Sequence, residues 1–250
     1  MPPQSPKPVL LIQAGTPPED IRKREGDLPA WFRQALGQQA NDMEIVRVFE
    51  GESLPEPGAH RAAIITGSWA MVTDRLGWSE ATADWIRRAM DIGMPMFGIC
   101  YGHQVMAHAL DGEVGYHPAG LEVGCQEIAL LPCAKSDPLA GLLPSRFKAH
   151  LTHLQTVLKP PSGAAVLARS SHDAHQILRY GPHAVSTQFH PEFTPSISAA
   201  CVTHRAAMLR SEGRDPEAVL SALEETPFAQ GLLRRFLKRY ACEAPALTAV

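Results

Sequence analysis

The sequence predicts an α/β protein, with an open, mostly parallel sheet flanked by helices and a smaller antiparallel flap. Up to residue 112, short apolar runs alternate with longer amphipathic segments. Strands separated by helices need crossover connections, which make neighbouring strands parallel and cover both faces of the sheet. After residue 112, strand-like pieces follow one another with short turns. These later pieces either extend the sheet or form the antiparallel flap.

In chain order, the first strand is the apolar run at 9–12, which ends at Gly15. Apolar residues at helical spacing predict a helix over 29–36, closed by Gly37 as a C-cap. A second helical period covers 78–92 and places Trp85 and Ala89 on one face. The remaining elements expected in this half are strands at 44–49, 62–66 and 95–99 and a short helix at 102–110.

The second half of the chain first supplies strands and then helices. Strand-like pieces are expected at 122–131, 147–157, 165–168, 175–180 and 184–189. Helices are expected at 197–209, 216–223 and 228–240. Because the sequence contains no internal repeat, low-complexity tract or convincing linker, we predict a single domain over 1–250.

Composition excludes several functional classes. The 250 residues include 45% hydrophobic and 20% charged side chains, with a formal net charge of −3, so neither disorder nor a nucleic-acid partner is expected. No stretch approaches the roughly 18 apolar residues of a membrane span, and the N-terminus lacks the apolar core of a signal peptide. Five scattered cysteines build no disulfide framework. These features predict a cytoplasmic protein without a membrane partner.

The most informative segment is a nucleophile turn around Cys100. A predicted strand runs into this cysteine and a helix follows at once, with Gly98 two residues before it and Gly102 two residues after. Such a sharp turn brings backbone segments so close that side chains at the glycine positions would clash. The helix N-terminus favours the thiolate and can hold an oxyanion. A catalytic role is predicted for Cys100, whereas Cys125, Cys133, Cys201 and Cys242 are interpreted as ordinary buried cysteines.

His190 and Glu192 are the predicted partners of this nucleophile. A thiolate needs a base, and the base needs a group that orients it. Both residues follow a predicted strand, and in an extended segment residues two apart point to the same side. His190 would then face the sulfur while Glu192 accepts its other ring N–H. Pro191 biases His190 toward an extended conformation.

These motifs carry a family resemblance. The segment 98–104, Gly-Ile-Cys-Tyr-Gly-His-Gln, followed by 188–192, Gln-Phe-His-Pro-Glu, resembles class I glutamine amidotransferases, in particular the amidotransferase domain of GMP synthase and its stand-alone relatives. The resemblance covers about 9–193, with C-terminal helices over 194–250. It implies a flavodoxin-like sheet, a Cys-His-Glu triad formed by Cys100, His190 and Glu192, and no cofactor.

The resemblance also implies further site residues. The strand and turn at 64–68 match the family segment whose Gly67 N–H helps to form the oxyanion hole, and Tyr101 would supply the second N–H. Substrate contacts are implied for a second group of residues, namely Ser68, Gln104, Glu122, Val123 and Gly124. Two departures stand out: Ser68-Trp69 replaces a second glycine and a proline, and the family's His-x-Asp element is His153-Leu154-Gln155 here.

Three hypotheses about function follow. The first is a glutaminase that cleaves the side-chain amide of glutamine through a γ-glutamyl thioester. The second is a γ-glutamyl peptide or amide hydrolase with the same triad, and the third is a non-catalytic binding or regulatory module. No synthetase domain follows the triad, so any ammonia-accepting synthetase is expected to be a separate chain. The histidine pairs at 150/153 and 172/175 are interpreted as surface or structural residues, so no metal site is predicted.

Overall fold

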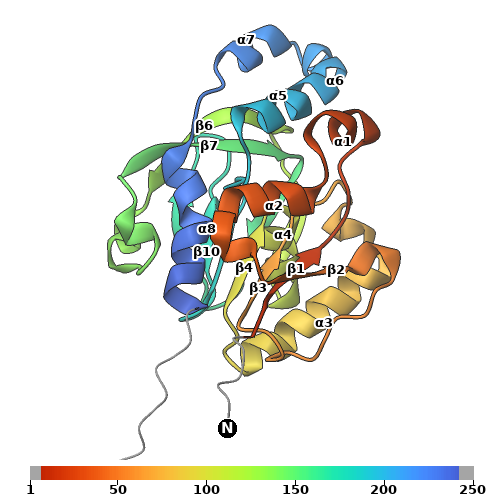
Figure 1. The fold of residues 1–250 in the computed structure, drawn as a ribbon. Helices are drawn as coiled ribbons and strands as arrows, with labels where there is room; N and C mark the ends of the chain where they lie inside the picture. The colour runs from red at the N-terminus through yellow and green to blue at the C-terminus, as the bar shows by residue number, and fades with distance from the viewer. Residues whose placement is uncertain (1–6, 242–250) are drawn as a thin grey trace, which may run out of the picture.

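A computed structural model describes residues 7–241 (Figure 1). Cys242, predicted to be an ordinary buried cysteine, lies outside the described residues. The described strands form a nine-stranded sheet and a separate two-stranded sheet. The strands of the large sheet, in spatial order, are β2 (Met43–Arg47), β1 (Val9–Gln13), β3 (Ala62–Ile65), β4 (Met96–Ile99), β11 (Ala184–Thr187), β10 (Ile177–Arg179), β9 (Ala165–Arg169), β6 (Glu122–Leu130) and β7 (Arg146–His153).

The two halves of the large sheet differ in direction. From β2 to β11 every neighbouring pair is parallel, as crossover connections require, whereas β11 to β7 pair antiparallel. The small sheet pairs β5 (Glu113–Tyr116) antiparallel with β8 (Gln155–Lys159). The mixed sheet and the separate antiparallel pair confirm the predicted fold class. The carboxyl ends of β3, β4 and β11 therefore meet at one edge of the sheet.

Helices cover both faces of the sheet (Figure 1). Helices α2 (Leu28–Leu36) and α8 (Pro227–Tyr240) pack on one face of the sheet. Helices α3 (Gly77–Asp91) and α4 (Tyr101–Ala109) pack on the other face. The helices are α1 (Glu19–Glu25), α2 (Leu28–Leu36), α3 (Gly77–Asp91), α4 (Tyr101–Ala109), α5 (Pro195–His204), α6 (Ala206–Ser211), α7 (Pro216–Ser221) and α8 (Pro227–Tyr240). Short 3-10 segments are η1 (Gly37–Ala40), η2 (Val48–Glu50), η3 (Val72–Asp74), η4 (Pro132–Ser136) and η5 (Ala140–Leu142).

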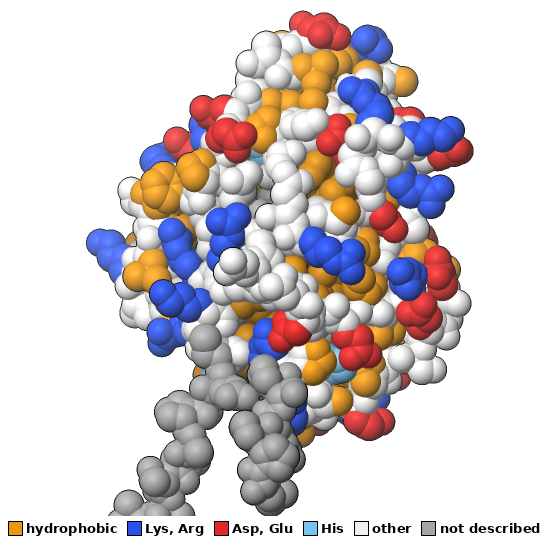
Figure 2. Space-filling model, in the orientation of Figure 1, with side chains coloured by type: hydrophobic (Ala, Val, Ile, Leu, Met, Phe, Trp, Pro, Cys, Tyr) orange, Lys and Arg blue, Asp and Glu red, His pale blue; other side chains and the backbone are white. Residues whose placement is uncertain are grey.

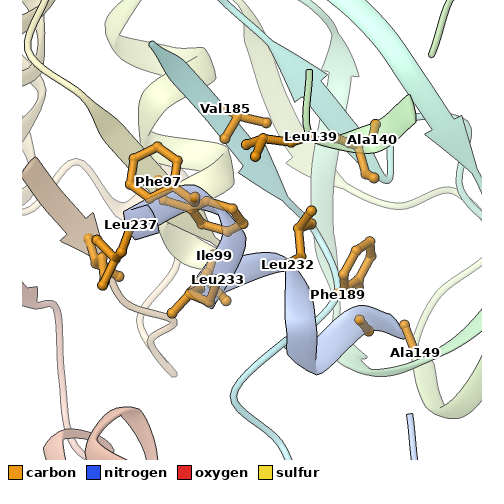
Figure 3. Close-up of a cluster of buried hydrophobic side chains, with 14 of the residues drawn as sticks. Phe97, Ile99, Leu139, Ala140, Ala149, Val185, Phe189, Leu232, Leu233 and Leu237 are labelled. Carbon is orange, nitrogen blue, oxygen red and sulfur yellow. The ribbon is translucent and has the colours of Figure 1, made fainter. Parts of the chain in front are cut away.

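Strand β1 shows why the sheet is buried on both sides. Its side chains alternate between the faces, with Leu11 in the cluster under α2 and α8 and Leu10 in the cluster under α3 and α4. In Figure 3, Phe97 from β4 and Leu233 and Leu237 from α8 lie together in the first of these clusters. Side chains of β4 pack in both clusters, so the turn that follows this strand is supported by the hydrophobic core on both faces of the sheet.

Some expected elements differ in the structure. The piece predicted at 147–157 is two strands, because the chain leaves β7 at Leu154 and enters β8 in the other sheet. The helix expected over 197–209 is divided into α5 and α6 at Arg205. Neither α1 nor β5 was predicted: seven and four residues, respectively, are too few to establish a period.

The surface carries charges of both signs. On the face drawn in Figure 2, Lys and Arg side chains are interspersed with Asp and Glu, and smaller apolar areas lie between them. Within residues 7–241, no helix combines the length and apolar character that crossing a membrane requires.

Candidate active site

Cys100 sits at a strained turn between β4 and α4. Its backbone has φ 51° and ψ −98°, a conformation that non-glycine residues rarely adopt. Two hydrogen bonds hold the turn: Cys100 N–H donates to the carbonyl of Thr187 in β11 (2.8 Å), and Gly102 N–H donates to the carbonyl of Thr66 after β3 (3.1 Å). Strain of this kind persists only where surrounding structure imposes it, and it is concentrated at functional sites.

The two flanking glycines are required by close backbone contacts. A Cβ on Gly98 would lie 2.5 Å from the carbonyl oxygen of Gly102, and a Cβ on Gly102 would lie even closer to the carbonyl oxygen of Ile65. Both obstacles are backbone atoms, which cannot rotate away as a side chain could. The predicted reason for the glycine spacing is confirmed.

His190 is held by its backbone, by stacking of its ring and by a contact with Glu192. Its N–H donates to the carbonyl of His150 within β7 (2.9 Å), and its ring stacks on Phe193 with 4.0 Å between centroids. On Gly67, a Cβ would approach His190 Cε1 to 3.0 Å, so only a small residue fits there. Nδ1 lies 2.7 Å from Glu192 Oε1. Among the described residues, the buried Nε2 atom has no hydrogen-bond partner.

The contact between His190 and Glu192 arises differently from the sequence prediction. An extended segment was expected, but Pro191 and Glu192 form a turn, and Phe193 N–H points back to the carbonyl of His190 (3.4 Å). The turn folds the carboxylate back onto the imidazole. The predicted proximity is therefore present, whereas the predicted strand alternation is wrong.

Electrostatics favour a charged pair at Cys100 and His190. Burial opposes ionisation of the Cys100 thiol, yet the positive charges of His190 and then His153 outweigh it and lower the thiol pKa. Burial also opposes the imidazolium of His190, but the charges of Glu192 and Cys100 raise its pKa to about 10. A lowered thiol pKa beside a raised imidazole pKa favours the thiolate and the imidazolium over the neutral pair.

A small, shallow cleft opens beside this pair. It brings together the cysteine, the histidine, the turn after β3, several aromatic side chains and one arginine. The lining residues are Leu28, Trp31, Gly67, Ser68, Trp69, Cys100, Thr152, His190, Phe193 and Arg205. Sequence reasoning did not find Arg205, because a single arginine after a helix carries no motif.

The turn after β3 is tied to the end of β1 by two hydroxyls. Thr66 Oγ1 accepts the N–H of Ala14 (3.0 Å) and donates to the carbonyl of Gly67 (2.8 Å). Ser68 Oγ donates to the carbonyl of Ala14 (2.8 Å) and accepts the N–H of Ala70 (3.0 Å). Tyr101 is the first residue of α4, so its N–H has no intrahelical acceptor. Within residues 7–241, neither Gly67 N–H nor Tyr101 N–H donates a hydrogen bond.

The other predicted substrate contacts lie outside this cleft lining. Gln104 is buried, and its amide donates to the carbonyl of Gln155 (2.6 Å) and to Gln188 Oε1 (3.0 Å). Val123 packs in a small apolar cluster between β6 and the C-terminal helices, and Gly124 follows it with φ +91°. The structure therefore brings together the predicted triad, Gly67 and Ser68, but not this second group.

Glu122 instead forms a buried ion pair with His153. Its Oε2 lies 2.8 Å from His153 Nε2, and its Oε1 accepts a hydrogen bond from Ser170 (2.6 Å). His153 Nδ1 faces the carbonyl of Gln155 at 2.9 Å. Ligand atoms of Glu122, His153 and Asp173 lie within 4.8 Å of one another. Both ring nitrogens of His153 face oxygen acceptors, and the pKa of the ring is raised, so the setting favours the imidazolium, which has no lone pair for a cation.

The remaining cysteines are unlike Cys100. Burial raises the pKa of Cys201 to about 12 and also raises that of Cys125. Both are buried, as predicted, but Cys133 is exposed, and the prediction of burial is wrong there. Cys133 lies on η4 at the surface, where its Sγ approaches the carbonyl of Val166 (3.1 Å).

The fold and the nucleophile turn define an α/β protein with a cysteine at the carboxyl end of a central strand. The sequence model of the family "Glutamine amidotransferase class-I" matches residues 33–206. The chain therefore belongs to this family, and it is an enzyme.

The relatives include a GMP synthase and a gamma-glutamyl peptidase. A glutamine-hydrolyzing GMP synthase from Aeropyrum pernix is 34% identical over 142 residues, which are 57% of this chain but only 25% of that protein. Gamma-glutamyl peptidase 4 from Arabidopsis thaliana is 25% identical over 93% of this chain and 96% of its own length. In structure, a glutamine amidotransferase from Methylobacillus flagellatus shares the fold with a TM-score of 0.77, at 22% identity over 98% of this chain and 100% of that one.

Proposed function

We propose that the protein hydrolyses the γ-amide bond of glutamine or of another γ-glutamyl amide, with Cys100 as nucleophile. His190 moves the protons, and Glu192 orients and stabilises its imidazolium. The observation that carries the proposal is the hydrogen bonding of the two ring nitrogens of His190. Its Nδ1 is engaged by a buried carboxylate at 2.7 Å, while its Nε2 is buried without a partner beside the cleft that Cys100 lines. A base oriented on one side and free on the other is what an adjacent nucleophile requires.

In the first half-reaction, the Cys100 thiolate attacks the γ-carbonyl carbon and forms a C–S bond. The carbonyl oxygen becomes an oxyanion, held by the N–H groups of Gly67 and Tyr101. His190 gives its Nε2 proton to the departing nitrogen, and the C–N bond breaks. Ammonia or an amine leaves, and a γ-glutamyl thioester remains on Cys100.

In the second half-reaction, His190 takes a proton from water at Nε2. The resulting hydroxide equivalent attacks the thioester carbon, the C–S bond breaks and glutamate leaves. The electron pair of that bond returns to sulfur, so the thiolate and the imidazolium are both restored. Glu192 keeps Nε2 as the reactive nitrogen in both halves, because its contact occupies Nδ1.

Hydrolysis of γ-glutamyl peptides is the second candidate. The alignment with a gamma-glutamyl peptidase spans nearly the whole length of both chains, whereas the alignment with a GMP synthase covers a quarter of that protein. Trp69 adds a large apolar surface to the cleft. Ammonia has no apolar group that could contact such a surface, whereas an amino acid or a peptide has one.

A separate synthetase chain is the remaining proposal about partners. One subunit of a glutamine-hydrolyzing GMP synthase from Ignicoccus hospitalis is 41% identical over 39% of this chain and 50% of that protein. If this chain also serves a synthetase, the isolated protein should hydrolyse glutamine slowly and show no strong preference for larger γ-glutamyl amides. Addition of the synthetase should then raise the rate.

The test is a substrate panel on the purified protein, with glutamate release as the readout. Wild type should release glutamate from glutamine or from γ-glutamyl amides, and Cys100→Ala should not. Cys133→Ala, which removes an exposed thiol away from the cleft, serves as the matched control and should keep full activity. Substituted amides cleaved at least about 100-fold faster than glutamine would favour a γ-glutamyl hydrolase, since about 2.7 kcal/mol is within reach of leaving-group contacts. Absence of glutamate release from every compound would refute the proposal.

A further inference from the structure

Arg205 brings a guanidinium to the cleft beside Cys100. Helix α5 begins after Thr194, whose Oγ1 accepts the N–H of Ile197 (3.3 Å), and it ends at Arg205. The Arg205 side chain donates from Nε to Thr152 Oγ1 in β7 (2.9 Å), which fixes the direction of the guanidinium plane. Both residues line the cleft.

This guanidinium has no carboxylate partner among the described residues. Elsewhere in the chain, a comparably buried arginine, Arg179, is paired through Nε and a terminal nitrogen with the carboxylate of Asp137. The sole side-chain hydrogen bond found for Arg205 within residues 7–241 is the one to the neutral hydroxyl of Thr152. Burial lowers the pKa of Arg205, so its charge is partly desolvated. A desolvated, unpaired charge is unfavourable unless an anion completes it.

The Cys100 thiolate interacts favourably with Arg205, but it is stabilised mainly by other groups. The charges that chiefly lower the thiol pKa are those of His190 and His153. Within residues 7–241 the two terminal nitrogens of Arg205 form no hydrogen bond, so they can bind an anion that enters the cleft.

In the proposed mechanism the leaving group departs next to His190, and His190 lines the cleft. Phe193 stacks on the ring of His190, the group that gives the proton to the departing nitrogen in the proposed mechanism. Trp31 packs edge-on against Phe193 with 5.6 Å between centroids, and Trp69 packs against the same apolar cluster. This side of the site thus combines aromatic walls with one guanidinium.

We infer that the leaving group is an amine that carries a carboxylate and an apolar side chain, that is, an amino acid or the N-terminal end of a short peptide. This inference rests on the proposed function and narrows its substrate class. The planar guanidinium of Arg205 binds the carboxylate through its two terminal nitrogens, while the aromatic walls contact the apolar side chain. Ammonia, the leaving group of glutamine, satisfies neither feature.

The test compares γ-glutamyl-leucine with γ-glutamyl-leucinamide, which differ only in the leaving-group carboxylate. Wild type should cleave the free acid with a kcat/KM about 10-fold or more above that of the amide, since a charge-assisted pair contributes about 1.5–3 kcal/mol. In Arg205→Gln, that ratio should fall to about 1. An effect of the substitution on the thiolate, or on binding of the shared glutamyl part, changes both kcat/KM values equally and leaves their ratio unchanged. Arg210→Gln, on the exposed face of α6, is the matched control and should keep the wild-type ratio.

Each other outcome identifies which claim is wrong. Equal cleavage of the acid and the amide by wild type refutes the role of Arg205 but leaves the proposed function standing. A loss in Arg205→Gln that is equal for both substrates assigns the arginine to the shared glutamyl part, which also refutes the inference. Absence of glutamate release from these compounds and from glutamine refutes the proposed function itself. If Arg205→Gln does not fold, as judged by circular dichroism, Arg205→Lys should reduce the ratio without abolishing it, and the wild-type comparison still decides.

Discussion

The Nδ1 atom of His190 lies 2.7 Å from Oε1 of Glu192, and 5% and 3% of the two residues are exposed. At this distance Nδ1 carries the proton and Glu192 accepts it. The contact aligns the ring and stabilises its positive charge in a buried site. In the proposed mechanism, Glu192 therefore acts through His190 and is a positioning residue.

We predict that His190→Ala lowers kcat by about 10²–10⁴-fold, because it removes the group that moves both protons. Glu192→Gln should lower kcat less. Its amide oxygen can still accept the Nδ1 proton, so the orientation of the ring survives while the stabilisation of the imidazolium is lost. Steady-state kinetics on one γ-glutamyl amide measures both effects.

A second readout separates orientation from folding. In Glu192→Gln, the basic limb of the pH profile of kcat/KM should move to lower pH, because the carboxylate charge that raises the pKa of the His190 imidazolium to about 10 is gone. Thermal unfolding of both variants shows whether the fold is retained. A kcat for Glu192→Gln below that of His190→Ala would mean that the roles are assigned incorrectly.

We predict that a glutamine-mimicking electrophile labels Cys100 before any other cysteine. The pH midpoint of the labelling rate should lie below the ordinary thiol value of about 8.5, because positive charge from His190 overcomes the effect of burial. In His190→Ala, burial is no longer opposed by this charge, so the midpoint should move upward. Peptide mapping by mass spectrometry identifies the labelled residue.

Cys201 is the internal control for this experiment. Burial raises its pKa to about 12, so it should remain unlabelled across the same pH range. Labelling of Cys125 or Cys201 ahead of Cys100 would refute the assignment of the nucleophile. A midpoint that did not respond to His190→Ala would remove His190 as the source of the lowered thiol pKa.

Local motifs were predictable from the sequence where a single backbone feature enforces them. The spacing of Gly98 and Gly102 around Cys100 is needed because each glycine meets a backbone oxygen, so the turn could be predicted from residue types alone. The strands that lead into the site were predictable for a related reason. Continuous apolar runs at 62–66 and 95–99 suit strands covered on both faces.

Features that depend on tertiary neighbours were not predictable. Nothing in the sequence around Arg205 indicates that its guanidinium would lie beside Thr152, which is 53 positions away. The break between β7 and β8 at Leu154 also has no local signal, because both strands have strand-like composition and only their pairing partners differ. Glu122 was assigned to substrate from the resemblance, yet its carboxylate is occupied by His153 and Ser170.

We predict that Gly102→Ala abolishes activity and lowers the free energy of unfolding, because the new Cβ would overlap the carbonyl oxygen of Ile65. Gly98→Ala should behave in the same way through Gly102. Gly77→Ala is the matched control: this glycine begins α3, and a Cβ there meets nothing within 4 Å. It should change stability by no more than about 1 kcal/mol and leave activity unchanged. Denaturant unfolding and the substrate assay together measure the effects, and an active, stable Gly102→Ala would contradict the described turn.

The last prediction concerns the buried pair of Glu122 and His153. Burial opposes the imidazolium of His153, but the hydrogen bond and charge of Glu122 outweigh it and raise the pKa above its ordinary value. A group whose pKa is higher in the folded protein than in the unfolded chain stabilises the fold fully below the unfolded value, about 6.5, and this contribution is lost as pH rises through the folded value. The advantage of wild type over Glu122→Gln should therefore be largest near pH 6.

We expect that advantage to be about 3–5 kcal/mol near pH 6, as is typical when one partner of a buried ion pair is removed, and to shrink by at most about 1.4 kcal/mol per pH unit above pH 6.5. Urea unfolding between pH 6 and pH 9 measures it, with both proteins in a Cys100→Ala background so that thiol ionisation does not contribute. Glu56→Gln is the control, because Glu56 pairs with Arg88 at the surface, where 83% and 54% of the two side chains are exposed. Its effect should stay below about 1 kcal/mol and be independent of pH in this range. A stability advantage of wild type that grows as the pH rises would mean that His153 is neutral in the folded protein. One of its ring nitrogens would then have a free lone pair that could accept a hydrogen bond or bind a cation.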